Sequence, residues 1–282
     1  WCVMGRIRLT QVFPCLLPLR KRQKKLFFYA KMRLDGNHYA EERSEQELPY
    51  LLFQTSWPLY SPKIRYDRIY QENKAFNLEL AEKVVDQMVI RPGETFSFWR
   101  AVRFANREIP YRDGPAVSDG RLQALPGGGL CLLSILLFWL FLHTPLTITE
   151  RHGHGIDFQL ETPVLSGKIP SGVDSAVAEG WLDLRARNDT RQNFQIRLAI
   201  LDGTITGQIF SDTAPSEYYR IINGDVERYR KSGKVYERAE VVRETYRLPD
   251  RECIGRQVLY QNDCEIGGID PMVETQGAEI TL

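Results

Sequence analysis

Apolar residues are distributed unevenly along the chain, and they are densest between Leu130 and Leu142. Apart from Cys131 and Ser134, every residue of this run is large and apolar. A helix at a protein surface keeps one polar face, and this run has none, so it predicts a buried helix. Its 13 residues fall short of the ~20 that span a bilayer, so we expect no transmembrane helix.

Helical periodicity also precedes the run. Phe76, Leu80, Val84 and Met88 recur every four residues and form one apolar stripe, with Asn73 as the expected N-cap. We expect this helix to end before the turn at 91–93, and a short strand to follow over 95–99. Weak periodicity predicts short helices and loops for 36–70, and loops around a site for 100–126.

The pattern changes to alternation in the second half. Residues 146–150, 182–187 and 194–200 alternate as strands do, and Asp202-Gly203 predicts a hairpin to 204–210. Stretches 234–248 and 257–260 are also strand-like. The sequence therefore predicts an α+β fold, with a mainly helical N-terminal half, a buried helix after a Gly-rich turn, and a C-terminal antiparallel β half.

Length and periodicity suggest three parts. They are a basic N-terminal extension and packing segment at 1–70, a core domain at 71–215, and a C-terminal β extension at 216–282. The whole has 282 residues, of which 43% are hydrophobic and 26% charged, as in ordinary folded proteins.

Charge is concentrated at the N-terminus. The net charge is +1, but residues 1–34 carry nine Arg or Lys and no acid, so the remainder carries −8. Such a head suits peripheral contact with an anionic membrane, and a solvated terminus is the alternative. Aromatics are not interleaved with basic residues on strands, so we expect no nucleic-acid partner. The expected location is cytoplasmic or peripheral to the inner face of the cell membrane.

Cysteine usage excludes some chemistry. The five cysteines include no CxxC pair, which argues against a zinc ribbon or a thioredoxin motif and favours a reduced compartment. The triplet Gly127-Gly128-Gly129 follows Pro126 and lacks the Lys-Ser/Thr of a phosphate-binding loop, and it does not fit a dinucleotide fingerprint. We expect no cofactor.

Cys131 is the candidate nucleophile. A thiol at a helix start lies near unpaired backbone N–H groups that stabilise the thiolate, and the glycines before it could present an oxyanion hole. His154 follows 23 residues on, and Asp174 lies 20 further. Cysteine, histidine and aspartate occur in this order in papain-like and transglutaminase-like enzymes. The alternative is a packed Cys131 beside glycines that permit close packing.

Histidines offer a second chemistry. His152 and His154 would face one side of a strand, and Cys131 or Glu150 could complete a metal site, but His-x-His is a weak signal and we predict no metal. His143 is expected to be a C-terminal helix histidine that bonds to local carbonyls. The predicted catalytic residues are Cys131, His154 and Asp174. The predicted binding residues are Gly127, Gly128, Gly129, Ser134, Glu150, Arg151 and His152.

Several motifs together resemble the VanW family of bacterial proteins. They include Pro92-Gly93-Glu94-Thr95-Phe96-Ser97-Phe98-Trp99, Gly127-Gly128-Gly129-Leu130-Cys131 and Arg187-Asn188-Asp189-Thr190. The resemblance implies an accessory role in glycopeptide resistance or cell-envelope physiology. The chain departs from the family pattern at Leu132, where Gln is usual, and at Gly155, where Ser is usual. It also reads Asp174-Ser175-Ala176 where family members often read Asp-Ala-Thr.

Two functions follow from the residues and the resemblance together. One is a Cys-His-Asp thiol hydrolase or acyltransferase that acts on a cell-wall amide. The other is a non-enzymatic ligand- or partner-binding module of the envelope, with a structural Cys131. A cell-wall precursor or a peptide is the expected ligand, and no oligomeric state is predicted.

Overall fold

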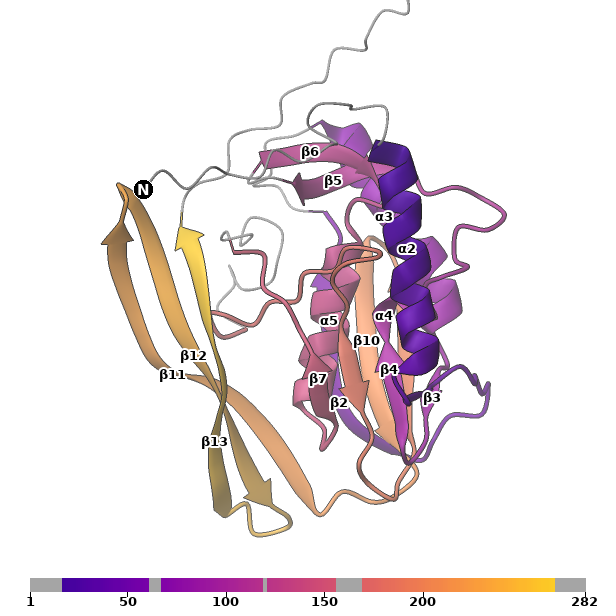
Figure 1. The fold of residues 1–282 in the computed structure, drawn as a ribbon. Coiled ribbons are helices and arrows are strands. Elements are labelled where there is room, and N and C mark those ends of the chain that lie inside the picture. Colours follow the sequence, from indigo (N-terminus) through magenta and orange to yellow (C-terminus); the bar gives the residue numbers. More distant parts are fainter. Residues whose placement is uncertain (1–16, 61–66, 119–120, 156–168, 267–282) are drawn as a thin grey trace, which may run out of the picture.

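The computed structural model describes residues 17–60, 67–118, 121–155 and 169–266. Four helices lie in the first half of this part: α2 (Leu17–Leu34), α3 (Arg68–Val85), α4 (Phe98–Ala101) and α5 (Leu130–Leu142). Long antiparallel strands fill the second half (Figure 1). The predicted α+β class is confirmed.

Two four-stranded sheets surround the buried helix. One has the order β2-β10-β9-β3, from β2 (Tyr50–Pro58), β10 (Thr204–Ser211), β9 (Phe194–Leu201) and β3 (Val89–Ile90). The other has the order β1-β4-β8-β7, from β1 (His38–Tyr39), β4 (Glu94–Ser97), β8 (Arg185–Arg187) and β7 (Thr147–Glu150). All pairings are antiparallel except that of β1 with β4.

Helix α5 lies at the centre of this core. Phe53 of β2 packs edge-on against Trp139, and Phe96 of β4 packs against Phe141 with ring centroids 5.0 Å apart. Gly207 of β10 leaves room for the helix, since a Cβ there would lie 3.1 Å from Leu140. Apolar side chains on every side of the run are thereby buried, as the sequence predicts.

A third sheet extends from the core. It has the order β11-β12-β13, from β11 (Glu217–Lys231), β12 (Lys234–Arg247) and β13 (Cys253–Ile266), and Figure 1 shows it as a long twisted ribbon beside the core. A two-stranded hairpin, β5 (Asp113–Ser118) with β6 (Arg121–Pro126), leads into the glycine triplet. The hairpin at Asp202-Gly203 is confirmed, with both residues at positive φ.

Three local predictions are wrong. Residues 36–70 contain β1 and β2, because β2 pairs with β10, a partner about 150 residues away that no local pattern reveals. Helix α3 begins at Arg68 with Asp67 as N-cap, and the Asn73 side chain donates instead to the carbonyl of Asp113. Residues 100–126 are not only loops, since they include β5 and β6.

Within the described ranges, no helix combines the length and the apolar character needed to cross a membrane.

Candidate functional site

Cys131 is the second residue of α5, which begins at Leu130 directly after a left-handed N-cap at Gly129. Every other residue of α5 is buried, whereas Cys131 is only partly so, and its thiol is free. The sulfur donates to the carbonyl of Val177 in a long contact of 3.8 Å. First-turn N–H groups of a helix have no intrahelical partner, so the thiol lies in a region of positive potential.

His154 and Asp174 lie together, although 20 residues separate them. His154 Nδ1 is 2.7 Å from Asp174 Oδ1, and the His154 backbone N–H donates to Asp174 Oδ2 at 2.7 Å. Two bonds to one carboxylate fix both the ring and its backbone. Because Nδ1 faces Asp174, Nε2 is the ring nitrogen left for another partner.

Cys131 is that second partner. Burial by itself disfavours the imidazolium. Charge interaction with Asp174 and then with Cys131, and a side-chain hydrogen bond that the ring donates to each, raise the pKa of His154 well above its usual value. The same pairing holds the pKa of the Asp174 carboxyl below its usual range, against the opposing effect of burial. The three residues predicted as catalytic therefore meet in space, and their catalytic role stays a prediction.

A layer of further contacts holds this trio. Arg151 donates to the Asp174 carbonyl at 3.0 Å and to Asn262 Oδ1, and its guanidinium lies 4.1 Å from the centre of the Tyr260 ring. Tyr260 donates to the carbonyl of Gly172 at 3.1 Å. Tyr260 and Asn262 belong to β13, so the third sheet supports the segment that carries Asp174.

Ser134 fastens the same segment from the other side. Its hydroxyl lies 2.9 Å from that of Ser175, and both residues are fully buried. Ser134 is one helical turn after Cys131, and Ser175 follows Asp174 directly. This bond therefore sets the position of the thiol relative to the carboxylate.

The glycine triplet has a packing role. A Cβ on Gly128 would lie 2.0 Å from the carbonyl oxygen of Gly114, and one on Gly129 would lie 2.2 Å from Lys74 Cγ. Gly127 and Gly129 also have positive φ, which other residues adopt at a cost. Close packing thus accounts for Gly128 and Gly129, and the positive φ accounts for Gly127. The predicted oxyanion hole stays a prediction.

Glu150 and His152 belong to a different cluster. His152 Nε2 is 3.1 Å from Glu150 Oε1, and Glu150 also pairs with Arg185, which pairs in turn with the buried Asp183. His152 and His154 thus contact different carboxylates, unlike two ligands of one metal. Throughout the described ranges, no group of three or more His, Cys, Asp or Glu residues is arranged to hold a metal ion.

Two departures from the family pattern directly follow trio residues in the sequence, Leu132 after Cys131 and Gly155 after His154. Leu132 is 1% exposed and packs in the hydrophobic core. Gly155 is exposed, and no described atom lies within 4 Å of where its Cβ would be.

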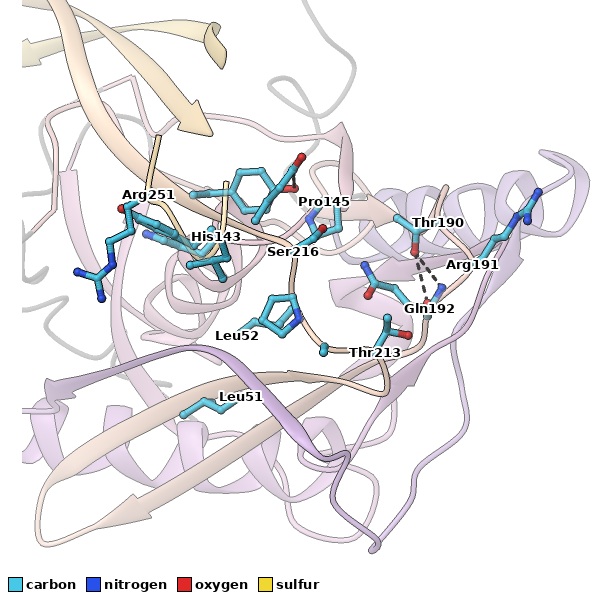
Figure 2. Close-up of a pocket in the computed structure, with 16 residues that line it drawn as sticks. Leu51, Leu52, His143, Pro145, Thr190, Arg191, Gln192, Thr213, Ser216 and Arg251 are labelled. Atoms are coloured by element: carbon cyan, nitrogen blue, oxygen red, sulfur yellow. Dashed lines mark hydrogen bonds between the residues drawn. The ribbon is translucent and has the colours of Figure 1, made fainter. Parts of the chain in front are cut away.

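Two pockets are lined by no residue of the trio. One has a volume of about 830 Å³. Leu51 and His143 of the core line one part of it, and Thr213 and Ser216, which precede β11, line another (Figure 2). His143 stacks on Phe53 and, at the end of α5, bonds to the carbonyl of Trp139 as expected, while burial lowers its pKa to about 4. The second pocket, of about 440 Å³, lies between β7 and β13 and includes Glu150 and Arg151.

The supporting residues Tyr260, Asn262 and Ser175 escape sequence reasoning. Asn262 offers one weak signal in the sequence, because it is a polar residue in a strand. The structure shows that it is only 6% exposed. Nothing local indicates that its partner is Arg151, which lies 111 residues earlier. Such contacts depend on how the third sheet packs on the core.

The fold and the trio define an α+β protein with a partly exposed helix-borne thiol paired to a histidine and an aspartate. The family model described as "VanW like protein" matches residues 73–210. The vancomycin B-type resistance protein VanW of Enterococcus faecalis is 49% identical over 93% of this chain and 94% of its own length. The chain therefore belongs to the VanW family.

A second relative is more distant. The uncharacterized protein YoaR of Bacillus subtilis is 29% identical over 52% of this chain and 46% of its own length. No solved structure matches the chain.

Proposed function

We propose that the chain is a thiol-dependent hydrolase or acyltransferase that acts on an amide of the cell wall and takes part in vancomycin resistance. The observation that carries the chemistry is the meeting of a partly exposed Cys131 with His154 and Asp174. The name of the Enterococcus faecalis relative supports the biological setting.

The residues suit one sequence of steps. The Cys131 thiolate attacks the amide carbonyl carbon, and the backbone N–H of Cys131 stabilises the resulting oxyanion, because those of Leu130 and Leu132 already donate to Gly127 and Gly129. The protonated His154 gives its proton to the leaving amine, so the C–N bond breaks and a thioester forms. His154 then takes a proton from water or from an acceptor amine, which attacks the thioester and releases the thiol. Asp174 keeps the imidazole oriented and stabilises its charged form.

Selective alkylation tests the nucleophile. Iodoacetamide at about neutral pH should label Cys131 ahead of Cys253, which is exposed, and Cys264, which is partly buried. Peptide mass spectrometry measures the labelling rate of each cysteine. In a His154→Ala variant, the labelling of Cys131 should slow while that of the other cysteines stays constant. The proposal would be contradicted if Cys131 were labelled no faster than Cys253 and if His154→Ala left the labelling rate of Cys131 unchanged.

A non-enzymatic binding module is the second candidate. It is favoured by Gly128 and Gly129, which packing explains without a ligand, and by the His154 side chain, which is only 8% exposed. It predicts that a Cys131→Ser variant keeps full function. Growth in vancomycin of a host lacking its own VanW-family gene, complemented with wild type or with Cys131→Ser, separates the two.

A further inference from the structure

Helix α2 has a row of apolar side chains that face outward. Leu19, Leu26, Phe27 and Leu34 are 66%, 68%, 64% and 86% exposed. Their spacing of seven, eight and fifteen residues from the first places them on one face of a helix. Single exposed leucines are ordinary at protein surfaces, but four large side chains in one row form a patch.

The opposite face of α2 already accounts for its packing on the core. Met32 is 2% exposed, and Tyr29 donates to Glu179 at 3.1 Å. Phe28 packs against the hydrophobic core. The outward row is therefore not required to fold the protein, and it makes α2 apolar on two sides. Figure 1 shows α2 lying across the outside of the molecule.

Basic residues border the row on both sides. At 100° per residue, Arg20 and Lys31 fall on one side of it, and Arg22 and Arg33 on the other. The α2 segment contains seven Lys or Arg and no Asp or Glu. An apolar face bordered by cations is the arrangement of helices that lie in the interface of anionic bilayers.

We propose that α2 is a membrane-surface helix, which lies flat on an anionic phospholipid bilayer with Leu19, Leu26, Phe27 and Leu34 among the acyl chains. The basic residues beside the row would then meet lipid phosphates. A second copy of the chain fits this face poorly, because two such helices would bring two sets of seven cations together.

The membrane contact has a consequence for the thiol. Lys24 lies 3.7 Å from the centre of the exposed Trp181 ring, and Lys25 pairs with Glu179. The carbonyl that accepts the Cys131 thiol is that of Val177, in the same short segment. The segment 177–181 therefore lies between the membrane-facing helix and Cys131. Its exposed Trp181 is of a residue type that is favoured at bilayer interfaces.

Vesicle co-sedimentation of the full chain tests the proposal. Wild type should sediment with vesicles of phosphatidylglycerol and phosphatidylcholine in equal parts, and much less with phosphatidylcholine alone. The double variant Leu26→Glu/Phe27→Glu should bind the anionic vesicles at least about tenfold more weakly. Arg22→Gln/Arg33→Gln should weaken binding and reduce its dependence on salt.

The matched control is Leu201→Glu/Val258→Glu, which changes two apolar side chains that are 72% and 51% exposed away from α2. It should bind as wild type does. Equal binding by the α2 variant and this control would overturn the proposal, because the contact would then lie elsewhere. A concentration-dependent dimer in light scattering that the α2 variant abolishes, without vesicle binding by wild type, would also overturn it.

Discussion

Cys131 differs from its neighbours on α5 because it reaches the surface while they do not. The run around it predicts burial for every position, and twelve of the thirteen are indeed buried. A cysteine that merely filled the core would be expected to be as buried as they are. Partial exposure beside His154 is what a nucleophile requires, and it is the strongest argument at the scale of a single residue.

Asp174 should control the reactivity of the thiol. In an Asp174→Asn variant the carboxylate no longer stabilises the imidazolium, so the pKa of His154 falls and the thiolate loses its charged partner. Alkylation of Cys131 at about pH 6 should slow at least about tenfold, while that of Cys253 stays constant. Unchanged rates at both cysteines would show that Asp174 does not act on the thiol.

The same pair should make stability depend on pH. His154 has a raised pKa in the folded state, so its contribution is complete below its ordinary value of 6.5 and is lost as the pH rises through the folded value. Asp174 has a lowered pKa, so its contribution is complete above 3.8 and is lost as the pH falls through the folded value. Both are complete between 3.8 and 6.5.

The measurement is urea unfolding of wild type and Asp174→Asn. The difference in unfolding free energy should be largest at about pH 5 and smaller at about pH 9. A difference that grows toward alkaline pH would mean that the pair is not charged in the folded protein.

At the scale of elements, α5 is joined to the Asp174 segment by the bond between Ser134 and Ser175. Ser134→Ala should cost about 1–3 kcal/mol in unfolding free energy, because it leaves the buried Ser175 hydroxyl without its partner. The double variant Ser134→Ala/Ser175→Ala should recover part of this loss, which urea titration measures. Strict additivity of the two single losses would argue against the bond.

The turn before α5 should tolerate no side chain at Gly128. The added methyl group of Gly128→Ala would overlap the carbonyl of Gly114, so the hairpin β5-β6 and the helix must separate. We expect a loss of about 3 kcal/mol or more in thermal or urea unfolding. Gly255→Ala, whose Cβ would find ordinary contacts at 3.7 Å, is the control and should change stability far less.

At the scale of the whole molecule, the third sheet holds the segment that carries Asp174 through contacts of Tyr260 and Asn262. Asn262→Ala removes one of two acceptors of the Arg151 guanidinium, the other being the Asp174 carbonyl, so the Asp174 segment loses one of its supports. Alkylation of Cys131 should slow several-fold relative to Gln261→Ala, a neighbouring change on the exposed side of β13. Identical rates in the two variants would mean that the sheet does not influence the thiol.

Sequence patterns predict this protein well where the contacts are local. The buried helix α5, the hairpin at Asp202-Gly203 and the strand 194–200 each depend on neighbouring residues, and each is present. Short helices and loops were expected for residues 36–70, and this was wrong. The strand β2 there depends on pairing with β10, far along the chain, which local periodicity does not reveal. The boundaries 1–70, 71–215 and 216–282 stay predictions.

The sequence alone determined that a glycine triplet precedes a helix with no polar face, and that a cysteine stands at its first turn. Periodicity and backbone chemistry suffice for that, because they act over a few residues. Only the tertiary structure decided which residue of the helix stays partly exposed and what surrounds it. His154 and Asp174 reach Cys131 from segments outside the strands, and Asn262 of β13 reaches Arg151 across 111 residues. Such separations leave no local pattern.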